Sequence, residues 1–178
     1  LFFQAEPAFS GRTEVKAGNL RILGIDPGSG VTGYGVIDKS GNYLRYVLHG
    51  EIKAGKNFPL SSILTDIFRQ LKSVIAQTCP HSASLENIFY GKNVRSLIRQ
   101  AQVRGVVIYA CASQGIPVYE YSPLEMKKAV VGYGRAEKRQ VQMMVKTILK
   151  LSEVPPADAA DALALAICHA NFLKEQTL

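Results

Sequence analysis

The sequence predicts an α/β fold in which helices flank a five-stranded mixed sheet, made of an antiparallel meander plus parallel strands. Three observations support this prediction. Five short apolar segments have strand-like patterning, turn residues alone separate the first three, and segments with helical spacing of apolar residues follow from residue 60. Strands joined by tight turns pair antiparallel, whereas strands joined through helices pair in parallel. With 178 residues, 47% of them hydrophobic, the chain can bury the core of one such domain.

The first three predicted strands occupy residues 21–26, 34–38 and 43–53. Residues 21–26 are apolar on both alternating faces, which is typical of a central strand covered on both sides. The glycine-rich segment PGSGVTG follows Asp26 and is predicted to be a turn. Residues 39–42 contain Ser-Gly-Asn, which favours a hairpin between the second and third strands.

Helices and strands alternate through the rest of the chain. Apolar residues recur at helical spacing in the longer segments, and the strands between them are short. A helix begins at Ser122-Pro123-Leu124-Glu125, which combines a capping box with proline at the first helical position, and it stops at Gly132. The other predicted elements are helices over 60–77, 93–114, 137–151 and 157–173, and strands over 82–86 and 116–121.

The helix over 93–114 has an unusual composition. Residues 105–112 are apolar all round, so we expect both sides to be buried. One side can pack on the sheet, and the other then suits a contact with a second subunit. The alternative is that a further element of the same chain covers it.

The chain is basic, with a net charge of +7 and a pI near 9.4, which favours a polyanionic partner. The alternative is that the charge only aids solubility. No apolar run approaches the roughly 20 residues that cross a bilayer, so no membrane partner is expected. Cys79, Cys111 and Cys168 are widely spaced and odd in number, which predicts neither a disulfide framework nor a zinc site. A reducing, cytoplasmic location fits best.

The two ends of the chain differ from the domain between them. Residues 1–20 mix charge, Gly and Pro without periodicity, and we interpret them as a cloning remnant or a flexible extension. Residues 21–174 are expected to form the single domain, and residues 175–178 a C-terminal tail.

Four carboxylates occupy positions that favour a metal site. Asp26 ends the first predicted strand, Glu86 ends the fourth, and Asp158 and Asp161 lie three residues apart on one face of the last helix. That face continues through Leu165, Cys168 and Phe172, an apolar stripe. Two acids at the head of a buried stripe are costly unless a positive group meets them.

Each acid also has a structural interpretation, as a turn residue, a strand-end polar residue or a residue that complements the helix dipole. Taken together they favour a site for two magnesium ions, because hard divalent cations take oxygen ligands and no His or Cys accompanies this set. The hypothesis requires the four acids to converge without being paired to Lys or Arg.

The order of the elements is that of the RNase H-like fold, and four segments make a resemblance more specific. They are ILGIDPGSGVTGYGVI at 22–37, LENIFYGKNVRS at 85–96, VVGYGRAEKRQVQMMV at 130–145 and ADAADALALAICH at 157–169. With consistent spacing from residue 21 to residue 172, they resemble the motifs of RuvC-type Holliday-junction resolvases.

The resemblance implies a structure-selective, magnesium-dependent endodeoxyribonuclease that acts in DNA recombination and repair. It places Asp26, Glu86, Asp158 and Asp161 on the four catalytic carboxylates that bind the metal. It also implies two Mg²⁺ per active site, with Mn²⁺ as a substitute, and a homodimer that cuts two opposing strands of a four-way DNA junction. Whether a branch-migration motor complex also binds is left open.

Aromatic and basic residues around these motifs are candidates for DNA binding. Phe89 follows Glu86 closely, and an exposed aromatic there can stack on an unpaired base; the alternative is a core aromatic. Cations near the two glycines of the Gly132–Gly134 loop suit phosphate contacts. By resemblance Phe89 wedges at the crossover, and two lysines match basic positions linked to DNA binding and activity. The candidates are Phe89, Lys92, Arg95, Lys127, Lys128, Arg135, Lys138 and Arg139, with Lys127 and Lys138 the two matches.

The chain departs from the family pattern at Gly30, Ile63, Ala101 and Val103. These positions leave the acidic set intact and bear on local DNA contacts and helix packing. Two other functions remain as alternatives: an RNase H-like nuclease acting on another nucleic acid, and a non-catalytic junction-binding module. GIDPGSG also resembles the first phosphate loop of actin-like ATPases, but these need two related lobes, for which the chain is too short.

Overall fold

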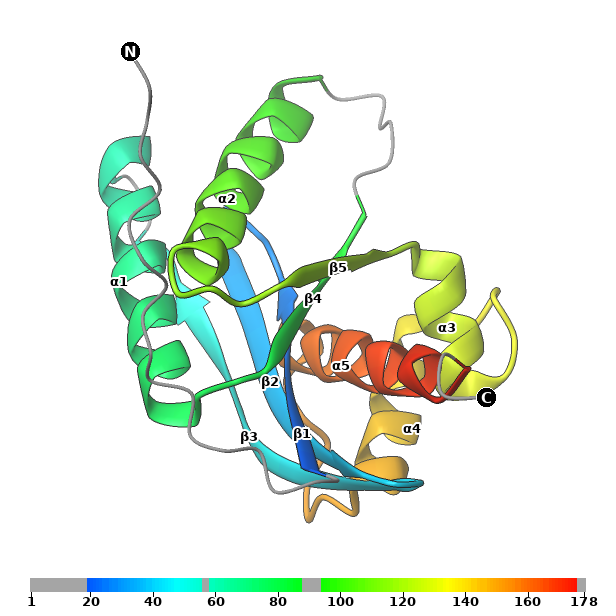
Figure 1. Cartoon of the computed structure of the whole chain (residues 1–178). Helices are drawn as coiled ribbons and strands as arrows, with labels where there is room; N and C mark the ends of the chain where they lie inside the picture. Colours follow the sequence, from blue (N-terminus) through cyan, green and yellow to red (C-terminus); the bar gives the residue numbers. More distant parts are fainter. Residues whose placement is uncertain (1–18, 56–57, 88–93, 176–178) are drawn as a thin grey trace.

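The computed structural model describes residues 19–55, 58–87 and 94–175 (Figure 1). Its five strands form one sheet in the order β3-β2-β1-β4-β5, which confirms the predicted mixed sheet. β1 pairs antiparallel with β2 and parallel with β4, and β4 pairs parallel with β5. The strands are β1 (Asn19–Asp26), β2 (Val31–Ser40), β3 (Tyr43–Lys53), β4 (Ser82–Glu86) and β5 (Val118–Tyr121).

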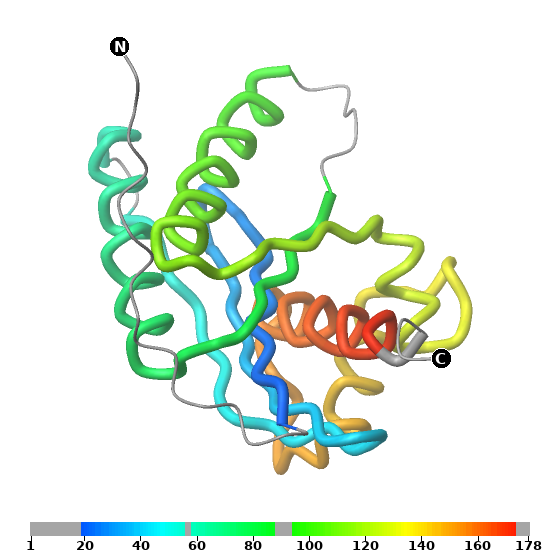
Figure 2. Tube along the Cα trace, in the orientation of Figure 1, coloured from blue at the N-terminus to red at the C-terminus, as the bar shows by residue number. Residues whose placement is uncertain are grey.

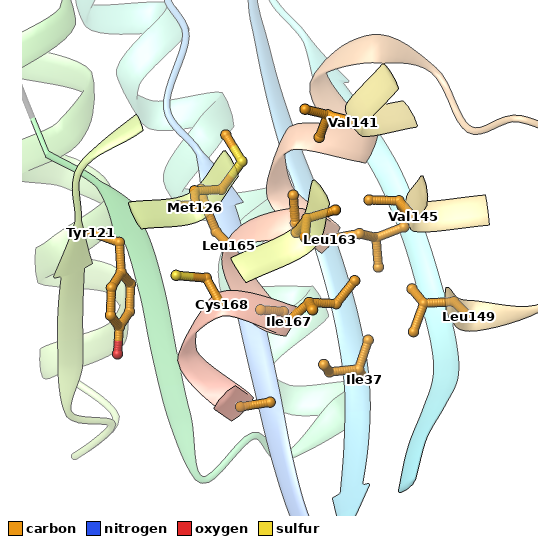
Figure 3. Close-up of a cluster of buried hydrophobic side chains, with 14 of the residues drawn as sticks. Ile37, Tyr121, Met126, Val141, Val145, Leu149, Leu163, Leu165, Ile167 and Cys168 are labelled. Carbon is orange, nitrogen blue, oxygen red and sulfur yellow. The ribbon is translucent and has the colours of Figure 1, made fainter. Parts of the chain in front are cut away.

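Five helices cover the two faces of the sheet, so that the described chain has three layers (Figures 1 and 2). α1 and α2 lie on one face and enclose one apolar core, while α3, α4 and α5 lie on the other face and enclose a second core. Figure 3 shows the second core, in which Leu163 and Ile167 of α5 meet Ile37 of β2 and Val145 of α4. The helices are α1 (Leu60–Thr78), α2 (Val94–Ala112), α3 (Pro123–Val131), α4 (Lys138–Leu149) and α5 (Ala157–Glu175).

The strands differ from prediction mainly at their ends. β1 begins at Asn19, because Asn19 and Leu20 pair with the end of β2. β2 begins at Val31 rather than at residue 34, so the predicted turn PGSGVTG is a strand in its second half. Glycine has a low strand propensity, and pairing with β1 and β3 overrides it at Gly33. β5 is shorter than predicted and begins at Val118.

The helix boundaries follow local signals closely. The Ser122 side chain accepts a hydrogen bond from the Glu125 amide, and the Glu125 carboxylate accepts one from the Ser122 amide. The predicted capping box at the start of α3 is therefore confirmed. Gly132 ends α3 with φ +92°, a conformation that glycine adopts without strain. Among the described residues, no helix is both long and apolar enough to cross a membrane.

The C-terminal half of α5 is fastened to the parallel strands by a buried polar chain. The two ring nitrogens of His169 lie 2.6 Å from the Tyr121 hydroxyl (Nδ1) and 3.0 Å from Ser82 Oγ (Nε2). Burial lowers the pKa of His169 to about 4, so its ring is neutral at physiological pH. Because His169 contacts both β4 and β5, the last helix has a fixed position on the sheet.

Candidate metal centre

Three of the four predicted acids meet where β1 ends and α5 begins. Asp26 is the last residue of β1, and Asp158 and Asp161 lie in the first turns of α5. One carboxylate oxygen from each residue lies within 4.8 Å of the others. All three side chains are partly accessible, so a small cation can reach them from solvent.

Small residues bring α5 close enough to the sheet for this meeting. A Cβ on Gly24 of β1 would lie 1.9 Å from the carbonyl oxygen of Ala162, and one on Gly33 of β2 would lie 2.0 Å from that of Asp158. The helix offers buried alanines, including Ala159 and Ala162, toward the strands. The backbones therefore touch, and the first turn of α5 lies beside Asp26.

This role of the glycines was not predicted from the sequence. Part of the signal was nevertheless present, since Gly24 and Gly35 lie inside the predicted strands 21–26 and 34–38, whereas Gly33 falls in the predicted turn between them. An interior glycine in a strand often marks a close approach of another backbone. The alanine-rich last helix is the matching partner.

Glu86 lies beside the three-acid group without contributing an oxygen to it. It ends β4, which is the parallel neighbour of β1, so both strand ends reach the same edge of the sheet. The charge of Glu86 contributes to the raised pKa of Asp26, and the charge of Asp161 contributes to the raised pKa of Glu86. The predicted convergence therefore holds closely for three acids, with the fourth at the margin.

Burial and mutual repulsion make the negative charge of this site costly. Burial, and then the charges of Asp161, Glu86 and Asp158, raise the pKa of Asp26 to about 7. Burial is also the largest cause of the raised pKa of Glu86 and of Asp161. The charges of Lys127, Lys138 and Arg104 offset only part of the effect on Glu86.

Lys138 pairs with two of the acids, contrary to the expectation that they would be free of such partners. Its Nζ lies 2.9 Å from Asp161 Oδ2 and 3.5 Å from Asp158 Oδ1. Burial works against the Lys138 charge, but the hydrogen bond with Asp161 and the nearby acids raise its pKa. Lys138 begins α4 and its side chain is 53% exposed, so it can swing away without unpacking a core.

The donor set fits a hard divalent cation. Its ligand atoms are carboxylate oxygens, which magnesium prefers. One lysine can balance only one of the three clustered charges, and burial together with the neighbouring acids makes the charge of Asp26 costly. A divalent cation would supply the missing charge.

The predicted DNA-binding residues have different positions in the structure. Lys127 of α3 is half-buried and its charge acts on Glu86 and Asp161. Phe89 and Lys92 lie outside the described residues. The exposed cations are Lys128 on α3, Arg135 in the following loop, Arg139 on α4 and Arg95 at the start of α2.

Both sides of α2 were expected to be buried, but in the single chain the side that faces away from the sheet is partly exposed. Val103, Val107 and Cys111 pack against the sheet, as expected, but Tyr109 is 64% exposed. Its ring stacks on Phe68 of α1 at a centroid distance of 5.9 Å. An apolar groove runs between α1 and α2, lined by Leu64, Phe68, Gly105, Val106 and Tyr109 among others. Among the described residues, no element of the same chain covers it.

The chain resembles known proteins over nearly its whole described length. The family model for the crossover junction endodeoxyribonuclease RuvC matches residues 22–169. Proteins of that name from Brevibacillus brevis and Thermotoga maritima are each 47% identical over 154 residues, which is 86% of this chain and 93% and 92% of those proteins.

Solved structures show the same similarity. Thermus thermophilus RuvC in complex with a Holliday junction substrate has a TM-score of 0.84 at 31% identity and covers 89% of this chain and 97% of its own. A second structure of Thermus thermophilus RuvC has a TM-score of 0.79 at 31% identity and covers 89% of this chain and 98% of its own. The yeast mitochondrial Holliday junction resolvase Ydc2, at 15% identity, a TM-score of 0.62 and 89% and 85% coverage, shares the fold.

Proposed function

The chain belongs to the crossover junction endodeoxyribonuclease RuvC family, and we propose that it resolves four-way DNA junctions by metal-dependent phosphodiester hydrolysis. The observation that carries this proposal is the group of Asp26, Asp158 and Asp161 at the end of a central strand, with Glu86 at its margin. The relative solved with a Holliday junction substrate supports the choice of DNA.

We assign the metal to magnesium, with Mn²⁺ as a substitute and two ions per site. Asp26, Asp158 and Asp161 would hold the ions, and Glu86 would complete the set from β4. When bound, the cations activate a water molecule and stabilise the leaving oxygen of the phosphodiester. The strand and helix ends keep the carboxylates in place, since rigid elements hold ligands more precisely than loops do.

Lys138 has a second task in this proposal. Its single charge is shared between Asp158 and Asp161 in the metal-free protein. Once a cation takes over that charge, the exposed lysine is free to reach a phosphate of the substrate. Lys127, whose charge acts on Glu86 and Asp161, is a second lysine near these acids.

Other cations would hold the arms of the junction. Lys128, Arg135 and Arg139 border the loop between α3 and α4, and Arg95 begins α2. Phe89 and Lys92, outside the described residues, complete the proposed DNA surface. Counterion release would make binding fall steeply as salt rises.

The active form is proposed to be a homodimer in which a second copy covers the groove between α1 and α2. Leu64, Phe68, Val106 and Tyr109 make this groove apolar, and exposed contiguous apolar surface marks interaction sites. A two-fold dimer presents the same metal site twice, which suits symmetric cleavage of a substrate with near two-fold symmetry. A branch-migration motor complex is proposed as a further partner on the family resemblance alone.

The nuclease domain is proposed to comprise residues 21–174, preceded by the two residues that start β1. We propose a cytoplasmic location, because the proposed substrate is cellular DNA. No described feature favours a rival substrate over the junction.

A cleavage assay on three substrates tests the proposal. Labelled four-way junction, linear duplex and RNA–DNA hybrid are incubated with the protein, with and without Mg²⁺. We expect paired nicks in the junction only, and only with the metal. Cutting confined to the hybrid would identify another RNase H-like nuclease. Junction binding without cutting in any metal would identify a binding module.

A further inference from the structure

Arg104 is a buried cation beside the proposed metal site that the catalytic proposal does not use. It lies in the second half of α2, on the side that faces the sheet, and only 7% of the residue is exposed. Burying a guanidinium is costly unless its donors find acceptors. Two groups on different strands contact it, one through a hydrogen bond and one through an ion pair.

The first partner is the backbone of Glu86. Nη1 of Arg104 donates to the carbonyl oxygen of Glu86, the residue at which β4 ends. The next residue, Asn87, donates its amide to the carbonyl of Tyr121 on β5. The backbone around Glu86 is therefore held by α2 on one side and by β5 on the other.

The second partner is the Glu120 side chain on β5. Nη2 of Arg104 lies 2.6 Å from Glu120 Oε1. The Glu120 side chain is 44% exposed, whereas that of Arg104 is 9% exposed. An ion pair with a half-exposed glutamate does not by itself require a buried arginine, so the contact to Glu86 accounts for the depth of the guanidinium.

We propose that Arg104 is a positioning residue for Glu86, whose carboxylate it aims at the metal site by fixing the backbone at the end of β4. The inference rests on the proposed metal role of Glu86. Its chemistry requires arginine, because a planar fork of donors can bind a carbonyl on one strand and a carboxylate on the next. A lysine has the charge without the fork.

A purely structural role for Arg104 makes a different prediction. If Arg104 only ties α2 to β5, removing either member of the Arg104–Glu120 pair should have the same effect. If Arg104 acts through Glu86, removing Glu120 leaves the decisive contact intact. Glu120→Gln is therefore the matched control, since it keeps the shape and removes the ion pair.

The test compares wild type, Arg104→Met, Arg104→Lys and Glu120→Gln in three measurements. Mn²⁺ binding to the DNA-free protein is followed by calorimetry, junction affinity is measured in EDTA, and single-turnover cleavage is measured against Mg²⁺ concentration. For Arg104→Met we expect metal binding and cleavage to weaken about tenfold, the range for losing a residue that orients a ligand. Junction affinity, which needs no metal, should stay at the wild-type level. Glu120→Gln should match wild type throughout.

Two results would overturn the inference: wild-type Mn²⁺ affinity in a folded Arg104→Met protein, or an equal loss in Glu120→Gln. If Arg104→Met does not fold, Arg104→Lys decides, because it keeps the charge and should still bind Mn²⁺ more weakly than Glu120→Gln. A wild-type protein that binds no Mn²⁺ and cuts no junction would instead overturn the proposed function.

Discussion

Gly33 lies so close to Asp158 that a Cβ at residue 33 would come within 2.0 Å of the Asp158 carbonyl oxygen. Gly33 is also the register partner of Asp26 across β1 and β2. One position without a side chain therefore sets the distance between the acid that ends a strand and the acid that begins a helix.

Replacing Gly33 by Ala should damage both stability and cleavage. The new methyl group meets backbone rather than a flexible side chain, so α5 must move away from β2. We expect a loss of about 1–3 kcal/mol in the free energy of unfolding, as for other overpacked sites. Cleavage should fall further than the unfolded fraction explains. Gly30→Ala is the control, because a Cβ at Gly30 meets nothing within 4 Å; a Gly33→Ala protein as active as that control would contradict the account.

Asp26→Asn should separate binding from chemistry. Removing the carboxylate at the end of β1 should reduce Mg²⁺-dependent nicking by roughly a thousandfold while junction affinity in EDTA is kept. The metal-free variant should also be more stable than wild type at pH 8, since a costly charge is gone. Thermal unfolding in EDTA measures this. Glu153→Gln, which removes an exposed acid elsewhere, should change neither property; unimpaired nicking by Asp26→Asn would remove Asp26 from the mechanism.

Asp26 should make the metal-free protein less stable as pH rises from about 4 to 7, so the wild-type protein should lose stability over this range relative to Asp26→Asn. His169, whose pKa burial lowers to about 4, acts in the opposite direction over part of this range, but it is present in both proteins and cancels in the comparison. Burial and neighbouring acids raise the pKa of Asp26 from 3.8 to about 7, so in this window the folded state binds a proton that the unfolded state has lost. By linkage, proton uptake by the folded state means that stability decreases with rising pH. Metal binding should tighten over the same range, because the proton must leave first. Urea unfolding in EDTA between pH 4 and 8, carried out on wild type and on Asp26→Asn, measures how the free energy of unfolding changes with pH. If both proteins gave the same pH dependence, a group other than Asp26 would be responsible for it.

Lys138→Met should make the protein more dependent on metal. The variant loses the cation that lies 2.9 Å from Asp161 Oδ2, so Asp158 and Asp161 remain unbalanced until a divalent ion binds. We expect about 1 kcal/mol less stability in EDTA, a modest figure because the side chain is half exposed. Mg²⁺ should then raise the melting temperature more than in wild type, although cleavage is slower. Lys72→Met on α1 is the control; an unchanged response to Mg²⁺ would show that Lys138 does not stand in for the metal.

Tyr109→Glu should dissociate the proposed dimer. Tyr109 and Phe68 stack at the mouth of the apolar groove between α1 and α2, and a carboxylate there would have to be buried in the interface. Sedimentation velocity should show monomers, and junction cleavage should lose its paired nicks. Gln114→Glu adds the same charge on an exposed residue beyond α2 and should remain dimeric. A wild-type protein that is monomeric at micromolar concentration would refute the dimer itself.

Much of the fold follows from local patterns. Period-two and helical spacing of apolar residues predicted all five strands and the helices between them, and the capping box at Ser122 predicted the start of α3. β2 was the main shortfall, since its first residues follow the glycine-rich turn and include Gly33, which has low strand propensity and is held in the strand by pairing with β1 and β3. Local rules describe such segments poorly because their hydrogen-bond partners are distant in sequence.

By itself the sequence determined where the acids lie on their elements: at the ends of two strands and at the start of an alanine-rich helix. Strand and helix periods fix these places within a few residues of chain. Only the tertiary structure decided that Lys138 reaches Asp158 and Asp161 and that Glu86 lies beside the three-acid group. It also decided that Arg104 contacts the Glu86 carbonyl at the end of β4. These relationships depend on how α5 and α2 pack on the two faces of the sheet. For α5 the distance is set by backbone contacts at Gly24 and Gly33, which exist only once the layers are packed together.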